Sequence, residues 1–393
     1  MVFPERFSNL PEYAFPRLRG LLDAYAPGND VVHMSIGEPQ HEFPGWVSEV
    51  IAAHAQDFRR YPVNDGAPWL LTAISDWIAR RYGVPVDPSN EVMALNGTRE
   101  GLFNAAMALC PETTGDGPAA ILIPNPFYQV YAAAAASVGA EPVFVAASEA
   151  SGNLPDYSAL PEDVLKRTTA AYICSPSNPQ GAVADRAYWK ALIGLAEKYD
   201  FRIFADECYA EIYRDMPPPG ALEVARAMGA DPDRVLIFHS LSKRSNMAGL
   251  RSGFVAGGAE SIARIKQLRT FGGAPLPIPL QRAAEKLWAD EEHVQQNRAL
   301  YREKYVLADQ IFDGIAGYQG PQAGFFLWLP VDDGETAALR AWREAGVRVL
   351  PGAYLGRTVN GKNPGQGYIR VALVAPIQEM QRGLIGLRDC LYG

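Results

Sequence analysis

The sequence is poor in the residues that build disulfide-bonded and metal-dependent proteins. Its four cysteines, Cys110, Cys174, Cys208 and Cys390, lie far apart and form no CxxC pair. Such isolated thiols are typical of a protein whose cysteines stay reduced. The five histidines show no metal-ligand spacing, so we expect no bound metal.

Long apolar runs and blocks of positive charge are also missing. No apolar stretch approaches the roughly 20 residues that a membrane helix needs, and the N-terminus lacks the apolar core of a signal peptide. The net charge of −8 and the pI near 5.3 argue against nucleic acid as a partner. Together with reduced thiols, these absences predict a cytoplasmic protein that binds neither membranes nor nucleic acids.

The pattern of apolar residues predicts an α/β fold. The chain has 393 residues, of which 48% are hydrophobic, and is long enough for two domains. Helical patterns alternate with short apolar runs, which predicts a mostly parallel central sheet with helices on both faces. Helices are predicted over 66–82, 98–109, 127–138, 186–199 and 259–270, and strands over 119–123, 142–146, 170–174, 201–205, 235–238 and 253–256.

After about residue 275 the character of the sequence changes. A helical stretch leads to three apolar runs and a terminal helix, which predicts a smaller α+β domain. The stretch and the runs lie at 278–315, 324–329, 347–350 and 368–374. We therefore expect an N-terminal segment that packs with the small domain, a large domain and a small C-terminal domain, with bounds 1–44, 45–275 and 276–393.

Four groups of polar residues follow apolar runs, at the place where a parallel sheet collects its ligands. Each group alone has an ordinary structural explanation: a helix N-cap, a proline-rich turn, a capping carboxylate or a solvated lysine. Four groups at one sheet edge favour a binding site instead. The groups are Asn96–Glu100, Ser175–Gly181, Asp206–Tyr209 and Ser240–Arg251.

The residue types in these groups suit a phosphate and a carbonyl. The N–H groups of a helix that starts after Gly97 attract an anion. Ser240, Ser242 and Arg251 supply hydroxyl groups and a cation that would neutralise a dianionic phosphate. Lys243 is one of eight lysines against twenty-eight arginines. Its amine could form a Schiff base, for example with pyridoxal 5′-phosphate (PLP).

A second phosphate-binding pattern is incomplete. The segment Gly356–Lys362 matches most of a P-loop, but Asn363 replaces the required Ser or Thr. The following Pro364 and Gly365 cannot open the helix that this motif demands. We predict a surface loop there. No GxGxxG dinucleotide motif occurs either.

Six motifs occur in one order along the chain: Asn96–Glu100, Asn178-Pro179-x-Gly181, Asp206-x-x-Tyr209, Ser240-x-Ser242-Lys243, Arg251 and Arg370. In this combination the chain resembles the fold-type-I PLP enzymes of the class I and II aminotransferase family over nearly its whole length. The resemblance implies a PLP-dependent aminotransferase whose small-molecule substrates are amino acids and 2-oxo acids. It also implies a large PLP-binding domain, a small domain built from both termini, and a homodimer with active sites at its interface.

The resemblance further implies a role for each residue at the cofactor ring. Lys243 resembles the lysine that forms the Schiff base and later carries the proton. Asp206 resembles the partner of the ring nitrogen. Asn178 and Tyr209 are similar to the pair that hydrogen-bonds the ring hydroxyl oxygen, and Tyr128 is similar to the aromatic residue that stacks on the ring.

The same resemblance implies which residues bind the phosphate and the substrate carboxylate. Tyr61 looks like the phosphate contact that reaches over from the neighbouring subunit. Arg370 resembles the fork that grips the substrate α-carboxylate beside Asn178, and Gly37 belongs to the segment Ser35–Pro39 that covers the substrate. The remaining phosphate contacts implied are the backbone of Gly97, Thr98 and Arg99, with Ser240, Ser242 and Arg251.

Longer stretches resemble the succinyldiaminopimelate aminotransferases of lysine biosynthesis. This implies N-succinyl-LL-2,6-diaminopimelate as amino donor and 2-oxoglutarate as acceptor. The segment Phe271–Pro277 departs from the pattern where a His-Gly pair is expected, which leaves the substrate open. The matching stretches are Asn125–Gln129, Phe238–Asn246, Asn297–Lys304 and Asn363–Gly367.

A long anionic substrate would need a basic far wall, because buried carboxylates need charge-assisted partners. Arg17, Arg19 and Arg244 are the predicted candidates. The alternatives are an aminotransferase for aspartate, alanine or aromatic amino acids, and a PLP-dependent C–S lyase or decarboxylase of the same fold. A PLP-sensing transcription factor is disfavoured, because the forty-odd residues of the N-terminal segment are too few for a DNA-binding domain and the chain is acidic.

Overall fold

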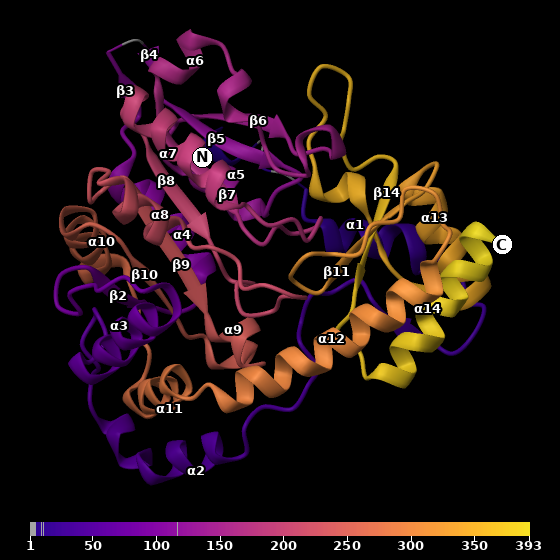
Figure 1. The fold of residues 1–393 in the computed structure, drawn as a ribbon, viewed down its shortest axis with the longest axis horizontal. Helices are drawn as coiled ribbons and strands as arrows, with labels where there is room; N and C mark the ends of the chain where they lie inside the picture. The colour runs from indigo at the N-terminus through magenta and orange to yellow at the C-terminus, as the bar shows by residue number, and fades with distance from the viewer. Residues whose placement is uncertain (1–4, 9, 11, 116) are drawn as a thin grey trace.

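A seven-stranded sheet forms the centre of the larger part of the molecule (Figure 1). The structure is a computed structural model that describes all residues except 1–4, 9, 11 and 116. Five neighbouring strands are parallel, whereas β10 runs antiparallel to both of its neighbours. The order is β2 (Val92–Leu95), β10 (Gly253–Ala256), β9 (Val235–Ser240), β8 (Arg202–Asp206), β7 (Thr168–Cys174), β5 (Ala120–Asn125) and β6 (Glu141–Ala146).

Helices cover both faces of this sheet, so its central strands are continuous apolar runs rather than alternating ones. Within β7, Ala171 and Ile173 belong to one hydrophobic core, and Ala170 and Tyr172 belong to the other. The first core is closed by α3 (Pro68–Tyr82), α7 (Arg186–Tyr199), α8 (Ala221–Met228) and α11 (Ile278–Ala289). The second is closed by α4 (Thr98–Leu109), α5 (Gln129–Ser137) and α10 (Ala259–Gly272).

The predicted mostly parallel sheet is confirmed, with two differences. Strand β2 was not predicted, because four apolar residues between polar ones give little signal of their own. The antiparallel direction of β10 was not predicted either, since an apolar run does not encode strand direction. The predicted helices 98–109 and 186–199 and the predicted strand 253–256 have the bounds of α4, α7 and β10.

The predicted helical stretch 278–315 is two helices, α11 and α12 (Glu292–Phe312). The break falls at Asp290, whose backbone is extended (φ −91°, ψ 129°) and whose Oδ1 accepts the His293 amide at 3.1 Å. The prediction of one helix was therefore wrong at this point. In Figure 1, α12 runs from beneath α9 (Leu241–Arg244) towards α14 (Ile377–Tyr392), joining the two parts of the molecule.

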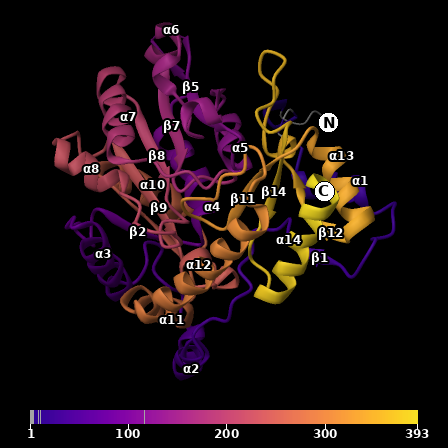
Figure 2. The same ribbon diagram turned by 45° about the vertical axis from the view of Figure 1, so that its right-hand side comes forward.

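A second, smaller sheet lies beside the first (Figure 2). It consists of β11 (Phe326–Pro330), β14 (Tyr368–Ala372) and β13 (Leu350–Pro351), all antiparallel. The N-terminal strand β1 (Val32–His33) pairs in parallel with β12 (Val347–Arg348), so both ends of the chain meet in this part. The division of the chain into domains at the bounds given above stays a prediction.

Shorter elements complete the fold. The segment Gly356–Lys362 lies in a loop between η7 (Gly352–Leu355) and β14, and no helix follows it, as predicted. The other elements are η1 (Glu5–Phe7), α1 (Ala14–Leu22), α2 (Trp46–Ala53), η2 (Ala55–Arg59), β3 (Thr113–Thr114), β4 (Gly117–Pro118), η3 (Glu149–Ser151), η4 (Tyr157–Ala159), α6 (Glu162–Lys166), η5 (Ala248–Leu250), α13 (Gly334–Arg340) and a π-helical turn at Ala341–Ala345.

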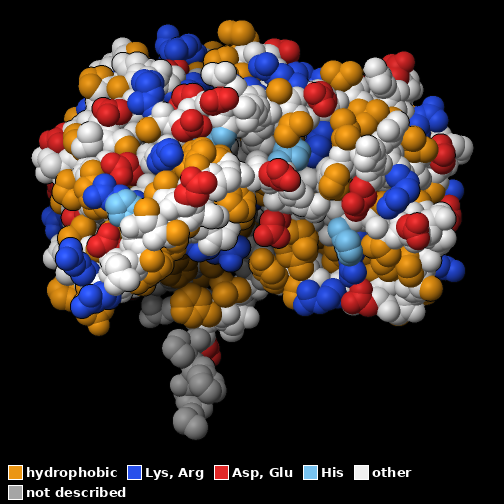
Figure 3. All heavy atoms as spheres, turned by 90° about the horizontal axis from the view of Figure 1, so that it is seen from below, with side chains coloured by type: hydrophobic (Ala, Val, Ile, Leu, Met, Phe, Trp, Pro, Cys, Tyr) orange, Lys and Arg blue, Asp and Glu red, His pale blue; other side chains and the backbone are white. Residues whose placement is uncertain are grey.

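The molecular surface shows no segregation of charge on the face drawn in Figure 3. Acidic and basic side chains are interspersed there, with hydrophobic side chains between them (Figure 3). Among the described residues, no helix is both long and apolar enough to cross a membrane.

Candidate active site

A cavity of about 360 Å³ lies beyond the carboxyl ends of β7, β8 and β9. The N-terminal segment and β14 close it from the other side. This is where parallel strands present polar residues to a ligand. The predicted site residues that line it are Gly37, Thr98, Arg99, Tyr128, Asn178, Asp206, Tyr209, Ser240, Ser242, Lys243, Arg251 and Arg370.

Two predicted residues do not belong to that lining. Gly97 lies directly behind Arg251, so close that a Cβ at this position would collide with the guanidinium group. Its φ of 86° also favours glycine. Tyr61 is fully exposed and lies away from the cavity of its own chain.

Lys243 stands on α9, a four-residue helix at the end of β9. The Ser240 side chain caps this helix by accepting the Ser242 amide at 3.1 Å. The Lys243 amine donates to the Gly37 carbonyl oxygen. Burial lowers the pKa of the Lys243 amine to about 8. A larger fraction of it is therefore neutral and nucleophilic near neutral pH than for an ordinary lysine.

Asp206 ends β8 and is buried at the floor of the cavity. Tyr131 donates its hydroxyl to Oδ2 at 2.8 Å, and the Cys208 amide makes a long 3.4 Å bond to Oδ1. Burial raises the pKa of the Asp206 carboxyl, and the hydrogen bonds from Cys208 and Tyr131 oppose that rise. A buried carboxylate with an open side suits a cationic partner such as a protonated ring nitrogen.

An anion site lies next to Lys243 at the N-terminus of α4. Arg251 adopts a left-handed backbone conformation (φ 56°). Its guanidinium group donates to the Asn96 carbonyl oxygen at 3.1 Å and to the Ala248 carbonyl oxygen at 2.9 Å. The hydroxyl groups of Ser240 and Ser242 lie 2.9 Å apart beside it. Two hydroxyls, a guanidinium and a helix N-terminus together fit a phosphate dianion.

Arg370 forms the opposite wall, on β14. Its Nη1 donates to Asn178 Oδ1 at 2.9 Å and its Nη2 donates to the Ser35 carbonyl oxygen at 2.8 Å. Its Nε is buried, and no described residue accepts a hydrogen bond from it. Burial lowers the pKa of this guanidinium to about 10, so it remains charged at neutral pH. An unsatisfied buried donor beside a charged fork fits a carboxylate.

The fold and these groups fit pyridoxal phosphate. An amine of lowered pKa, a buried carboxylate and a phosphate cradle are what its aldehyde, ring nitrogen and phosphate require. Together they define a fold-type-I PLP-dependent enzyme. The chain belongs to the class I and II aminotransferases, because the model of that family matches residues 29–384. It is therefore a PLP-dependent aminotransferase.

Named relatives and solved structures support this assignment. An LL-diaminopimelate aminotransferase from Desulforudis audaxviator is 33% identical over 98% of this chain and 97% of its own length. A crystal structure of an aminotransferase from Neisseria meningitidis has a TM-score of 0.93, 38% identity and 98% coverage of both chains. A Thermus thermophilus structure, described as a probable N-succinyldiaminopimelate aminotransferase, has a TM-score of 0.84 and 27% identity, with 96% of this chain and 100% of that chain covered.

The three residues predicted to form a basic far wall do not line the cavity. Arg244 is buried on the other side of α9, where its guanidinium donates to the Leu287 carbonyl oxygen at 2.6 Å and to Glu291 at 2.9 Å. Arg17 pairs with Glu335 at 2.7 Å. Neither these two residues nor Arg19 lines the cavity. Arg244 follows Lys243 directly in the sequence and therefore points to a different side of the helix. There it anchors α9 to the end of α11.

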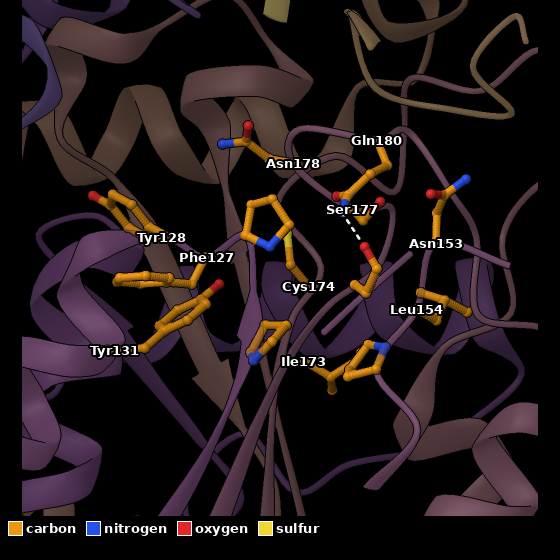
Figure 4. Close-up of a pocket in the computed structure, with 14 residues that line it drawn as sticks. Phe127, Tyr128, Tyr131, Asn153, Leu154, Ile173, Cys174, Ser177, Asn178 and Gln180 are labelled. Carbon is orange, nitrogen blue, oxygen red and sulfur yellow. Dashed lines mark hydrogen bonds between the residues drawn. The ribbon is translucent and has the colours of Figure 1, made fainter. Parts of the chain in front are cut away.

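Sequence reasoning also missed Tyr131, which lies within the predicted helix 127–138. Figure 4 shows Tyr131 beside Phe127 and Tyr128, around a small space next to the cavity. Tyr128 occupies the N-cap position of α5, and Tyr131 follows three residues later. Residues three apart at a helix start lie on one face, and that spacing was the available signal.

Proposed function

We propose that this aminotransferase takes its amino group from N-succinyl-LL-2,6-diaminopimelate and transfers it to 2-oxoglutarate. The observation that carries this proposal is Arg99, a guanidinium group in the cavity wall. Its Nε donates to the Tyr128 hydroxyl oxygen at 2.6 Å. No carboxylate of the described chain lies within ion-pair distance of Arg99.

A cation held by a hydroxyl group keeps its charge available for a ligand. A charge-assisted bond from Arg99 to a carboxylate far from the reacting carbon suits a long amino donor with a distal carboxylate. Short or purely apolar donors, such as alanine, have no group to offer it. The stretches that resemble succinyldiaminopimelate aminotransferases support the same substrate.

LL-diaminopimelate itself is the second candidate. The relatives named above as LL-diaminopimelate aminotransferases favour it. Glu38 also lines the cavity, and its carboxylate suits the free distal ammonium group that the succinylated substrate lacks. Both candidates carry the distal carboxylate that Arg99 requires, so the two differ only at the distal nitrogen.

The chain's own residues have separable roles in the proposed reaction. Bound PLP supplies an electron-withdrawing ring that stabilises negative charge at the substrate α-carbon. Arg370 holds the α-carboxylate. Asp206 keeps the ring nitrogen protonated by its negative charge. Lys243 Nζ, with its pKa lowered to about 8, takes the proton from the α-carbon. Ser240, Ser242 and Arg251 hold the phosphate.

The proposed enzyme works as a homodimer with shared active sites. Tyr61 is fully exposed and cannot serve the cavity of its own chain. Phe58, Val63 and Phe271 are also exposed apolar side chains, and large exposed apolar groups are typical of contact surfaces. In the dimer, Tyr61 of one chain would reach the phosphate in its partner.

A half-reaction screen tests the substrate proposal. Purified holoenzyme is mixed with one amino acid at a time, and conversion of the cofactor to its amino form is followed by absorbance. We expect kcat/KM for N-succinyl-LL-diaminopimelate to exceed the values for aspartate, alanine and aromatic amino acids by at least about tenfold, or ~1.4 kcal/mol. A similar preference for LL-diaminopimelate would select the second candidate. Ammonia release without acceptor would indicate elimination instead of transfer.

A further inference from the structure

The hydroxyl group of Tyr131 is fixed against Asp206 by buried packing. Tyr131 is fully buried on α5 and stacks on Tyr172, with ring centroids 4.5 Å apart and planes 12° apart. Tyr172 is held in turn by its own hydroxyl, which donates to the Leu102 carbonyl oxygen at 2.7 Å. Because neither ring can turn without breaking this packing, the Tyr131 hydroxyl has one position, 2.8 Å from Asp206 Oδ2.

Tyr131 also supports the residue expected to stack on the cofactor ring. Its ring meets that of Tyr128 edge to face, with centroids 5.7 Å apart and an interplanar angle of 84°. Figure 4 shows the two side chains next to each other at one side of the small space beside the cavity. A single buried side chain therefore contacts both Asp206 and Tyr128.

The two oxygens of Asp206 have unequal partners. Oδ2 accepts the short bond from Tyr131, whereas the Cys208 amide makes a long bond to Oδ1. The Cys208 side chain also hydrogen-bonds this carboxylate. The other titratable groups around this carboxylate are the Cys208 thiol, His239 from β9, Cys174 from β7 and the hydroxyl groups of Tyr128 and Tyr209. His239 is already paired with Glu207 at 3.0 Å, on the side of the sheet away from Tyr131.

We propose that Tyr131 is the positioning residue of Asp206: its hydroxyl group holds Oδ2, keeps Oδ1 available to the cofactor ring nitrogen and stabilises the ionised carboxylate. This inference rests on the role proposed above for Asp206. A carboxylate that accepts a hydrogen bond in a low-dielectric site binds a proton less tightly. The proton shared with the ring nitrogen then stays on the ring.

The test compares Tyr131→Phe with Tyr172→Phe. Each variant loses one buried hydroxyl and one hydrogen bond, but only Tyr131 touches Asp206. We expect Tyr131→Phe to weaken PLP binding about tenfold, which corresponds to ~1.4 kcal/mol, and Tyr172→Phe to leave it close to the native value. We also expect the pH midpoint of the visible absorbance change to rise in Tyr131→Phe, because a less cationic ring draws less charge from the Lys243 linkage.

Melting temperatures of the cofactor-free variants separate loss of the bond from loss of the fold. Similar melting temperatures with unequal PLP affinities support the proposal. If both variants lose affinity equally, or if the absorbance midpoint does not move in Tyr131→Phe, the proposal is overturned.

A double-mutant cycle with Asp206→Asn completes the test. If Tyr131 acts through Asp206, adding Tyr131→Phe to Asp206→Asn should cost far less PLP affinity than it costs in the native protein. Equal costs in both backgrounds would show a purely structural role and overturn the inference. An Asp206→Asn variant with native PLP affinity and absorbance would instead refute the role proposed for Asp206 itself.

Discussion

Asn125 holds the backbone of Arg357 at two points. The Asn125 Nδ2 group donates to the Arg357 carbonyl oxygen at 2.8 Å, and its Oδ1 accepts the Arg357 amide at 2.9 Å. The Phe127 amide adds a bond to the Leu355 carbonyl oxygen at 2.9 Å. The end of β5 is thereby tied to the loop that follows η7, and Leu355 of that segment lines the cavity.

We predict that Asn125→Ala loosens this wall of the cavity. The loss of two partly buried hydrogen bonds should raise KM for the amino donor roughly fivefold, or about 1 kcal/mol. PLP affinity should change little, because Asn125 does not contact the groups expected to hold the cofactor. Gln180→Ala is the control, since its buried amide donates to the Ala147 carbonyl oxygen and makes no bond to the Arg357 loop. Native KM in Asn125→Ala would contradict the prediction.

The chemistry of Lys243 should show in the pH dependence of cofactor attachment. Only the neutral amine attacks an aldehyde, so the rate at which cofactor-free protein attaches PLP should rise with pH through about 8. Stopped-flow absorbance measures this rate. A midpoint at the ordinary lysine value of 10.5 would contradict the prediction. Lys243→Ala should leave no cofactor that borohydride can fix to the chain.

A lowered pKa alone does not mark the reactive lysine. Burial lowers the pKa of the Lys304 amine to about 7, below that of Lys243. Lys304, however, donates to the carbonyl oxygens of Leu373 and Ala375 at 3.0 and 2.7 Å and is almost completely buried. Lys304 is therefore a structural lysine. What distinguishes Lys243 from it is that Lys243 lines the cavity.

Arg370→Lys should weaken amino-acid binding and leave PLP binding unchanged. Lysine keeps the charge, but it cannot make two parallel bonds to a carboxylate or replace the two donors that reach Asn178 and Ser35. We expect the Kd of the PLP form for the amino donor to rise at least about tenfold, ~1.4 kcal/mol. Titration of the absorbance change with the amino acid gives this Kd. An unchanged value would rule out the assignment.

Much of the site could be predicted because parallel strands end at one edge of a sheet. The polar groups after β7, β8 and β9 had to meet, and Asn178, Asp206 and Lys243 do line one cavity. What could not be predicted is the direction of a side chain. Arg244 follows Lys243 directly yet points into the core between Trp77 and Trp288.

Contacts between distant segments were equally inaccessible to sequence reasoning. Tyr131 and Asp206 lie 75 positions apart, and their bond exists because α5 packs against β5 and β6 while the Tyr131 side chain reaches across to stack on Tyr172 of β7. The direction of β10 depends on its pairing with β2, which no local pattern reveals. Residue types and spacing therefore predicted which residues belong to the site, whereas packing determines which of them are in contact.

The last prediction concerns Arg99, on which the substrate proposal depends. Arg99→Met keeps an apolar stem but removes the cation. We expect kcat/KM for N-succinyl-LL-diaminopimelate to fall by roughly tenfold to a hundredfold, because a charge-assisted bond contributes about 1.5–3 kcal/mol. The value for alanine, which has no distal carboxylate, should change by less than about threefold. Arg99→Lys should retain part of the activity, since the charge remains.

Two comparisons decide whether Arg99 recognises the distal carboxylate of the substrate or only holds Tyr128 in place. Arg17→Met removes a guanidinium that pairs with Glu335 outside the cavity lining, and it should leave both substrates unaffected. The Arg99 side chain also bonds the Tyr128 hydroxyl, so its loss could disturb the cofactor. In that case kcat/KM would fall equally for alanine and for the succinylated donor, and the proposed recognition of a distal carboxylate would be wrong. A selective loss is the expected result, because the guanidinium lines the cavity and no described carboxylate neutralises it.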